Sequence, residues 1–386
     1  KTNAYDMSCV QFALEALRMA DVHGMQLPKG PLEKARKAIW SYQLQDGGWP
    51  YAGDPNDPEN KSKAAMTAAT VAGLSFLDAV LAEPRRGAIR RDPHIASGLK
   101  ALDKKFDRIL KRTLKQGHGQ HYIYYSIERA GILTGTRFIG GKDWYRTIAK
   151  KVLKEQNKDG SWPSYRAGIA QRNKCLGTGF TLLFLGKGLA PTIVGKLDWG
   201  PSSRGTPWDM RHLTNAVTRE VATHLNWFTL PVEADVSEYM KVPLIYITGA
   251  DDPYDKLVKH KAKFVEYLNA GGTILGAGFD NGEKFEEGFK KFVGEIQPGA
   301  EFERVDLDHN LYKSWHTIRR RYGLYATLSD KGGRPVALFI DKPFAIPLGT
   351  RRGSGVKQSM ELGTNIVIAL TQIDKRRSIV ADIFED

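Results

Sequence analysis

The chain has 386 residues and a mass of 43.1 kDa, with 41% hydrophobic and 26% charged residues and a mean hydropathy of −0.39. This length and composition predict two or three globular domains and exclude a disordered, collagen-like or disulfide-stapled chain. The net charge is +14, and residues 101–200, with 19 basic and 7 acidic residues, carry +12 of it. Such a local excess indicates solvated helix faces or a region that contacts an anionic surface, an acidic glycan or a partner protein. No nucleic-acid-binding module accompanies the charge, so nucleic acid is not an expected partner.

The predicted elements change in kind along the chain. Helical spacing of apolar residues predicts helices near 7–22, 31–44, 63–81, 94–113, 119–131, 143–156 and 175–187. From Val242 onward, the short β-rich runs VPLIYITG, GTILGAG, FERVD, YGLYATL and RPVALFID alternate with helical segments such as 255–269 and 283–294. This alternation predicts a mostly parallel sheet. No apolar run reaches the length of a membrane-spanning helix, so we predict no transmembrane segment.

The two regions are joined by a segment of different composition. The stretch GKLDWGPSSRGTPWDM is rich in Gly, Pro, Ser and Trp, which favours a linker or a packed strap, and a helix is expected at 211–227. We therefore predict a helical domain at 1–190, a linker and packing segment at 191–235, and an α/β domain at 236–386.

An internal repeat with the pattern Gln-x-x-Asp-Gly-x-Trp marks the helical region. One copy consists of Gln43, Asp46, Gly47 and Trp49, and the other of Gln156, Asp159, Gly160 and Trp162. Each copy reads as a helix terminator: the Gly adopts the left-handed conformation, the Asp accepts from turn amides, and the Trp folds back over the helix end. The distance between the copies leaves room for a degenerate repeat between them.

These residues resemble the repeats of the prenyltransferase and squalene-oxidase superfamily, the terpenoid cyclase-like proteins. The resemblance covers roughly residues 7–190 and implies an α/α toroid of helical hairpins. Too few hairpins are present for a complete ring. We therefore expect a partial toroid, either an open arc or one whose first helices precede Lys1.

The catalytic residues of that superfamily are not evident here. The Asp-x-Asp-Asp acid of the cyclases does not occur. At the position that implies a zinc site in the prenyltransferases, Asn173 stands where an acid would be and Cys175 has no evident His partner, so we expect no metal and no cofactor. The string Asp251-Asp252-Pro-Tyr-Asp255 matches a magnesium-diphosphate motif in letters only, because that motif must lie on a helix wall and this one follows a strand.

Other side chains of the helical region have two possible roles. His118 and His121 could bind a metal but suit surface or capping positions better. Tyr124 and Glu128, beside Tyr122, Tyr125 and Arg129, are candidate ligand-binding residues lining the centre of a toroid, or else helix-packing residues.

The strand ends of the α/β region supply the remaining candidates. Ligands of open α/β sheets bind at the carboxyl ends of strands. The candidate ligand-binding residues there are Thr248, Asp251, Gly278 and Asp341, and the candidate catalytic residues are Asp280, Asp308 and His309. If the strand order brings them to one rim, they form a polar site. The glycines from Gly276 to Gly282 also suggest a phosphate-binding turn, although Asp280 would repel the phosphate.

The layout of residues 240–375 resembles an uncharacterised domain that follows toroid repeats in bacterial envelope proteins. That domain is similar to the flavodoxin-like glutamine-amidotransferase superfamily, which implies a three-layer α/β fold. The overall expectation is therefore a multidomain α and α/β protein of the bacterial envelope or periplasm that acts in binding or as a scaffold. The alternative is a lyase or hydrolase that acts on an anionic glycan or lipid through the acids and the histidine at the strand ends.

Overall fold

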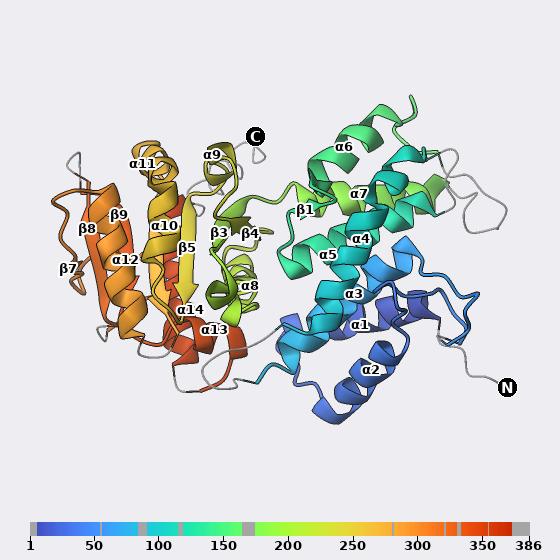
Figure 1. The fold of residues 1–386 in the computed structure, drawn as a ribbon, viewed down its shortest axis with the longest axis horizontal. Helices are drawn as coiled ribbons and strands as arrows, with labels where there is room; N and C mark the ends of the chain where they lie inside the picture. Colours follow the sequence, from blue (N-terminus) through green and yellow to red (C-terminus); the bar gives the residue numbers. More distant parts are fainter. Residues whose placement is uncertain are drawn as a thin grey trace, which may run out of the picture. The chain divides into compact units, whose positions relative to one another are not determined.

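The computed structural model describes residues 6–54, 56–83, 91–114, 119–163, 174–279, 282–319, 322–329, 333–353 and 355–372. The chain divides into a helical unit, within residues 6–81 and 91–190, and an α/β unit, within residues 82–83 and 191–372 (Figure 1). The predicted class, α plus α/β in separate domains, is confirmed.

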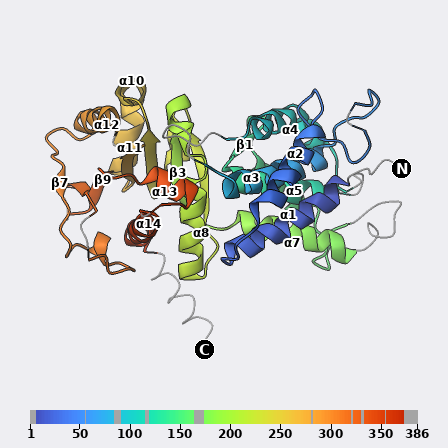
Figure 2. The ribbon, with the colours of Figure 1, turned by 90° about the horizontal axis from the view of Figure 1, so that it is seen from below.

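The helical unit is built around one central helix. It contains α1 (Met7–Val22), α2 (Lys29–Ser41), α3 (Ala64–Val80), α4 (Pro93–Lys111), α5 (Gln120–Thr134), α6 (Trp144–Lys154) and α7 (Lys174–Gly188). A hairpin of β1 (Phe138–Ile139) and β2 (Lys142–Asp143) precedes α6. Helix α3 packs against α1, α2, α4 and α5 (Figure 2). Helix α5 in turn packs against α6 and α7. Every residue of α3 from Met66 to Ala79 is buried, which explains why its sequence is apolar or small on all sides.

The helices that surround α3 and α5 are amphipathic where one face meets water. Helix α4 buries Leu102 and Phe106, and α6 buries Trp144, Ile148 and Val152, at the spacing of a single helix face. The predicted helices coincide with α1 to α7 to within three residues at each end. None of the helices in the described ranges is long and apolar enough to cross a membrane.

The α/β unit contains one seven-stranded sheet. Its strands are β3 (Thr192–Asp198), β4 (Asn226–Pro231), β5 (Leu244–Gly249), β6 (Thr273–Gly278), β7 (Glu303–Arg304), β8 (Leu324–Leu328) and β9 (Pro335–Ile340). Their order is β4-β3-β5-β6-β9-β8-β7, and only β8 runs antiparallel to its neighbours. The five strands that pair in parallel, β4, β3, β5, β6 and β9, follow the order 2-1-3-4-5 of flavodoxin-like doubly wound sheets.

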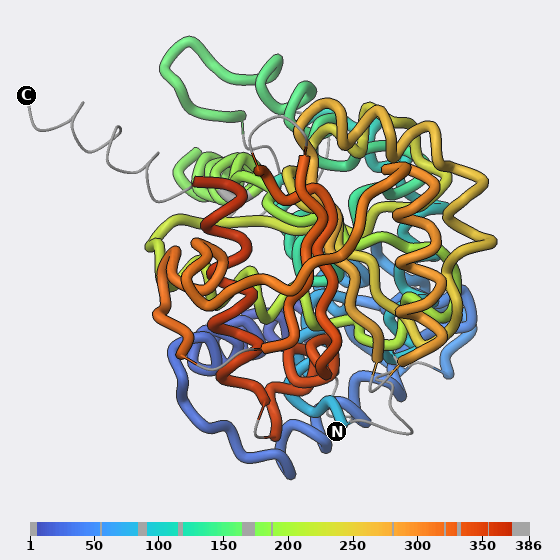
Figure 3. The backbone as a smooth tube through the Cα atoms, turned by 90° about the vertical axis from the view of Figure 1, so that its left-hand side faces the viewer, coloured from blue at the N-terminus to red at the C-terminus, as the bar shows by residue number. Residues whose placement is uncertain are grey.

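Helices cover both faces of the sheet and complete three layers (Figure 3). One face carries α8 (Asp209–Val221), α13 (Ala345–Thr350) and α14 (Val356–Thr371); the other carries α9 (Val236–Tyr239), α10 (Tyr254–Leu257), α11 (Lys261–Asn269) and α12 (Glu283–Ile296). Three 3-10 turns, η2 (Pro201–Gly205), η3 (Val258–His260) and η4 (Asn310–Tyr312), complete the described elements.

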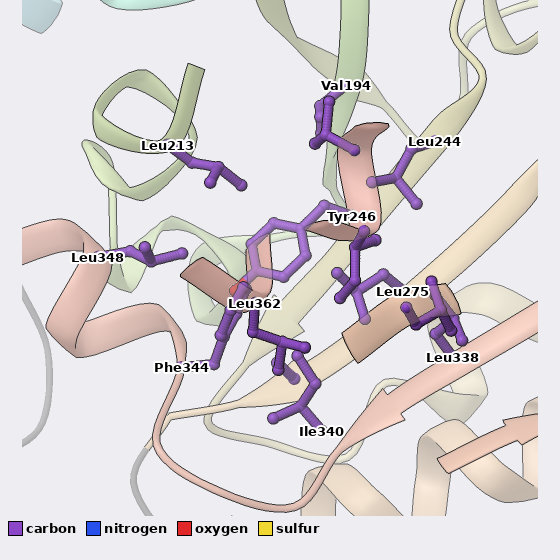
Figure 4. Close-up of a cluster of buried hydrophobic side chains, with 14 of the residues drawn as sticks. Val194, Leu213, Leu244, Tyr246, Leu275, Leu338, Ile340, Phe344, Leu348 and Leu362 are labelled. Carbon is purple, nitrogen blue, oxygen red and sulfur yellow. The ribbon is translucent and has the colours of Figure 1, made fainter. Parts of the chain in front are cut away.

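Strand β5 shows how its sequence serves both layers. Leu244 and Tyr246 face the first apolar cluster, whereas Ile245 and Ile247 face the second, as the two-residue period of a strand requires. Figure 4 shows Tyr246 among Leu213, Phe344, Leu348 and Leu362 of the first cluster. An apolar run of this kind is typical of a parallel strand buried on both faces.

The predicted linker at 191–235 is wrong. This segment forms β3, η2, α8 and β4, and β3 lies inside the sheet between β4 and β5. Apart from Gly195, which lies in β3, the Gly and Pro residues of the stretch that suggested a linker stand in the loop and the short η2 turn between β3 and α8. The helix expected at 211–227 ends at Val221, because Ala222 adopts the left-handed conformation with φ 49° before β4 begins.

Candidate functional site

The strand order places a topological reversal between β3 and β5. The chain leaves β3 to form β4 on one side of it and returns to form β5 on the other side. The carboxyl ends of β3 and β5, at Asp198 and Gly249, therefore flank the position where ligands of doubly wound sheets bind.

A buried ion pair lies just inside this position. Lys196 is 5% exposed, and its Nζ lies 2.7 and 2.8 Å from the two carboxylate oxygens of Asp209 and 3.1 Å from Thr206 Oγ1. Asp209 stands in the first turn of α8, and its carboxylate also accepts from the Thr206 hydroxyl and the Met210 amide, each at 2.7 Å. These mutual bonds fasten α8 to β3.

The carboxyl end of β5 is covered by the η2 turn. The amides of Ala250 and Asp251 both donate to Ser202 Oγ at 2.9 Å. The Trp199 indole donates to the Thr248 carbonyl oxygen at 3.0 Å. The two successive amides resemble an anion-binding nest, and here a hydroxyl of the same chain fills it.

The acid at the end of β3 is also engaged. Arg204 Nε lies 3.0 Å from both carboxylate oxygens of Asp198. The Ser203 hydroxyl donates to the same carboxylate at 3.2 Å. Asp198 therefore orders the η2 turn and contributes no unpaired negative charge to the reversal.

Two of the predicted residues lie at this end of β5, and they differ in exposure. Thr248 is fully buried, and its hydroxyl donates to the Ala277 carbonyl oxygen at 2.6 Å, which joins β5 to β6. Asp251 is exposed. Only the Asp251 carboxylate is therefore presented to a ligand in solution.

The phosphate-binding interpretation of the Gly276–Gly282 turn finds no support. Gly278 ends β6 and Gly282 caps α12, but Glu283 and Glu286 occupy the first turn of that helix. Their negative charge opposes a phosphate at the helix N-terminus. The candidate Asp280 lies outside the described residues.

Asp308 and His309 are not placed beside the other candidates. They follow β7, which three strands separate from β5, a distance of about 19 Å at about 4.8 Å per strand. Asp308 is paired with Lys313, whose hydrogen bond and charge hold the pKa of that carboxyl below its ordinary value. His309 Nδ1 accepts from the Leu311 amide at 3.2 Å and caps η4. The expected acid and base therefore serve local turn structure.

Asp341, at the end of β9, makes different contacts again. Its Oδ2 accepts from the Tyr325 hydroxyl at 3.3 Å, and a β-carbon on Gly323 would lie 1.5 Å from its Oδ1. The carboxylate is thus seated against the backbone of the neighbouring strand. The strand order separates Asp251, Asp341 and Asp308 along the edge of the sheet, so these acids form no single rim site.

The two Gln-x-x-Asp-Gly-x-Trp motifs form the same turn in the helical unit. The Gln43 amide donates to the Gly47 carbonyl oxygen at 2.8 Å, and Gln156 makes the same bond to Gly160 at 2.9 Å. The Asp carboxylate accepts from a turn amide in both copies, Gly48 N to Asp46 at 2.9 Å and Ser161 N to Asp159 at 3.1 Å. The Trp indole donates to the preceding helix, Trp49 Nε1 to Ile39 O at 2.8 Å and Trp162 Nε1 to Val152 O at 2.9 Å. The Trp amide donates to a threonine of the following helix, Trp49 N to Thr67 Oγ1 and Trp162 N to Thr178 Oγ1, each at 3.1 Å. These hydrogen bonds of the first motif therefore each have a counterpart in the second motif.

Tyr124 and Glu128 are buried. Tyr124 is 2% exposed, and burial raises the pKa of its hydroxyl. Glu128 is fully buried, and its Oε2 accepts from Arg129 Nε at 2.6 Å. His121 is engaged by Thr181 Oγ1 at 2.7 Å and the Pro163 carbonyl oxygen at 2.8 Å, while His118 lies outside the described residues. These contacts favour the packing interpretation of the cluster.

A polar pocket of about 710 Å³ lies beside the first motif. Its walls carry the acids Asp46 and Asp57 and the cations Lys61, Lys105 and Arg108. Amides and hydroxyls from the 41–62 region line the rest, with Leu44 and Pro58. The volume falls in the range of small-molecule sites.

Basic side chains form stripes on two helices of the helical unit. On α4 the exposed basic residues are Lys100, Lys104, Arg108 and Lys111, with the exposed acids Asp103 and Asp107 beside them, and on α6 the exposed basic residues are Arg146, Lys150 and Lys154. Each stripe runs at helical spacing opposite the buried face. In α6, Arg146 lies 3.7 Å from Asp143, whereas Lys150 and Lys154 have no ion pair within the described part of the chain. Leu153, 56% exposed, precedes Lys154 at the edge of this stripe.

The sequence interpretation missed the residues around the β3–β5 reversal. Lys196, Ser202, Thr206 and Asp209 were all assigned to a linker. The signal available was a lysine inside the apolar run TIVGKLD, followed by an acid shortly after Pro207, where a helix begins. The described residues hold no group of three or more His, Cys, Asp or Glu side chains that could bind a metal, and Cys175 is an exposed thiol in α7.

Residues 194–367 match the model of a family described as a domain of unknown function, DUF4159. The match begins inside β3 and ends inside α14, so it spans the sheet and the helices on both of its faces. No curated protein matches the chain.

Proposed function

We propose that this is a binding protein of the bacterial cell envelope whose helical unit attaches to an anionic phospholipid surface through α6. The observation that carries the proposal is the α6 stripe, in which Arg146, Lys150 and Lys154 share the exposed side of the helix with Leu153. Lysine and arginine near an anionic membrane contribute about 1 kcal/mol each, and an apolar side chain among them adds burial at the acyl boundary.

The exposed leucine favours a lipid surface over a soluble polyanion. A nucleic acid or an acidic polysaccharide offers charge but no apolar phase, so Leu153 would gain little from contact with either one. The buried face of α6, formed by Trp144, Ile148 and Val152, anchors the helix in the unit and leaves the opposite face free to contact a membrane.

The same proposal treats the helical unit as an arc of terpenoid cyclase-like repeats used for binding. The bond-for-bond equivalence of the two motifs supports the repeat. For the α/β unit we propose a glutamine-amidotransferase-like relationship, supported by the 2-1-3-4-5 strand order. Because the described strand-end acids Asp251, Asp308 and Asp341 stand after separate strands and Asp308 is paired with Lys313, binding is favoured over catalysis.

Co-sedimentation of the full chain with vesicles tests the proposal. Vesicles of phosphatidylglycerol and phosphatidylcholine should retain the protein at low salt, pure phosphatidylcholine should not, and about 0.5 M salt should release it. Lys150→Gln with Lys154→Gln removes about 2 kcal/mol of attraction, which is a roughly thirtyfold loss of affinity. Leu153→Ser should also weaken binding.

Matched control variants distinguish binding through α6 from a nonspecific effect of positive charge or of an exposed apolar side chain elsewhere on the unit. Lys34→Gln with Lys37→Gln removes two exposed charges from α2, and Leu182→Ser alters a leucine that is also 56% exposed, on α7. Both controls should bind vesicles like the wild type. Equal losses in the controls, or retention on dextran sulfate without retention on vesicles, would reject the lipid surface as the target.

A further inference from the structure

We propose that the pocket beside the first motif binds an acidic sugar, a polyhydroxylated ligand carrying a carboxylate or phosphate group. This site is separate from the α6 stripe, and nothing in the family match assigns it, because residues 194–367 lie entirely outside the helical unit. The pocket, of about 710 Å³, has room for one or two sugar rings.

The charge of the pocket favours an anion. Asp46 is already satisfied: Lys105 Nζ lies 3.0 Å from its Oδ2, Ser62 donates to the same oxygen, and the Gly48 amide donates to its Oδ1 at 2.9 Å. Lys61 and Arg108 line the same pocket and have no ion pair within the described part of the chain. Two cations of the lining, Lys61 and Arg108, therefore face one remaining acid, Asp57, and the pocket has an excess of positive charge.

The polar atoms of the walls favour hydroxyl groups on that anion. Gln45 makes no hydrogen bond to another described residue, and the Asn60 amide nitrogen is bound to the Ala52 and Asp54 carbonyl oxygens, so its own oxygen is left to accept. Amide and carboxylate groups exchange hydrogen bonds with ring hydroxyls. The described residues that line the pocket include no Trp, Tyr or Phe, so they offer a nucleotide base no ring to stack on.

The cluster of Ser62, Lys105 and Asp46 holds a ligand and does not attack it. Burial acts to raise the pKa of Asp46, but the bonds from Ser62, Gly48 and Lys105 outweigh it and hold that pKa below the ordinary value. The Ser62 hydroxyl therefore donates to a carboxylate that is too weak a base to activate it. One proton donor of the Lys105 ammonium remains for the ligand.

Isothermal titration of the full chain with four probes tests this inference. The probes are a galacturonate oligomer, glucose 6-phosphate, glucose and inorganic phosphate. We expect saturable binding of at least one acidic sugar, and the first two probes distinguish a carboxylate from a phosphate source. Glucose and inorganic phosphate should bind at least tenfold more weakly, since each presents only half of the required chemistry.

Variants on one helix face give the matched control. Arg108→Gln and Lys61→Gln should each weaken the acidic sugar about tenfold or more, the loss expected for a hydrogen bond to a charged group. Lys104→Gln removes another exposed charge, one turn from Arg108 and not among the residues that line the pocket, and this variant should bind the ligand like the wild type. Vesicle binding should not change in Arg108→Gln, which keeps this test apart from the α6 proposal.

Three results would overturn the inference: no saturable binding of either acidic sugar, phosphate binding as tightly as glucose 6-phosphate, or equal losses in Lys104→Gln and Arg108→Gln. Either of the first two results would show that the pocket does not recognise an acidic sugar. The third would show that the lost affinity comes from the overall positive charge of α4 and not from this pocket. Far-UV circular dichroism of each variant confirms that the helical unit is folded before titration.

Discussion

Gly47 lies so close to Ser97 that a β-carbon on residue 47 would stand 2.7 Å from the Ser97 carbonyl oxygen. Ser97 belongs to α4, so the first helix terminator, which follows α2, is in close contact with the second helix after it. At the equivalent Gly160 of the second terminator, no atom of a described residue lies within 4 Å of such a β-carbon. Both glycines are left-handed, with φ +82° and φ +79°. The two copies therefore differ in packing while sharing one backbone conformation.

This difference predicts unequal effects of the same substitution. Gly160→Ala should lower the free energy of unfolding by about 1–2 kcal/mol, the strain of a left-handed alanine. Gly47→Ala should lower the free energy of unfolding by about 1–3 kcal/mol more than Gly160→Ala does, because the backbone of α4 must move. Guanidinium unfolding followed by far-UV circular dichroism measures both. Equal losses would show that the contact with Ser97 relaxes freely.

The buried pair of Lys196 and Asp209 predicts a second large effect. Lys196→Met leaves the Asp209 carboxylate buried with only the Thr206 and Met210 bonds, and it should cost about 3–5 kcal/mol in urea unfolding. The exposed pair of Lys313 and Asp308 is the control, since Lys313→Met should change stability by less than about 1 kcal/mol. A loss below 1 kcal/mol at Lys196 would mean that water reaches Asp209.

Helices were the most predictable elements because their apolar spacing is regular. Helix α3 could be found from MTAATVAGLSFL, and the motif turns followed from Gly47 and Gly160, since a left-handed residue is required there. Strand β3 was missed for a physical reason. Lys196 breaks its apolar run, and only the tertiary contact with Asp209 makes a buried lysine tolerable.

The candidate site was less predictable than the fold because it depends on strand order. Asp251 and Asp308 both follow strands, and the sequence does not say that β9 and β8 form later in the chain and insert between β6 and β7. The pocket beside Asp46 was also hidden, since Lys105 and Arg108 reach it from α4, a helix distant from it in sequence. Local patterns identify elements and turns, whereas convergence of side chains is a property of packing.

The end of β5 predicts a third effect, at Gly249. A β-carbon there would lie 2.3 Å from Cζ2 of Trp199, whose indole is held by the Thr248 carbonyl oxygen. Gly249→Ala should therefore lower the midpoint of urea unfolding by an amount equivalent to about 1–3 kcal/mol. Gly294→Ala, at an exposed site of α12 with open space around it, should raise stability by about 0.5–1 kcal/mol. If both substitutions shift the midpoint the same way, Trp199 moves aside.

Asp78, near the end of α3, predicts how stability depends on pH. Burial, together with the charge of Asp92, raises its pKa to about 6, although the Asp92 amide donates to its Oδ2 at 3.1 Å and opposes the shift. An aspartate in the unfolded chain has a pKa of 3.8. Between these two values the folded chain binds the proton more tightly than the unfolded chain, so stability must fall as pH rises through this window.

Asp78→Asn should remove that fall. At about 1.4 kcal/mol per pKa unit, the free energy of unfolding of the wild type should fall by about 3 kcal/mol between roughly pH 4 and pH 7 because of Asp78. The variant should not show this fall. Guanidinium unfolding at a series of pH values measures the difference between the two curves. Asp57→Asn, at an exposed position of the same unit, should leave the wild-type curve unchanged in shape. Parallel curves for wild type and Asp78→Asn would mean that Asp78 is ionised in the folded protein across this range.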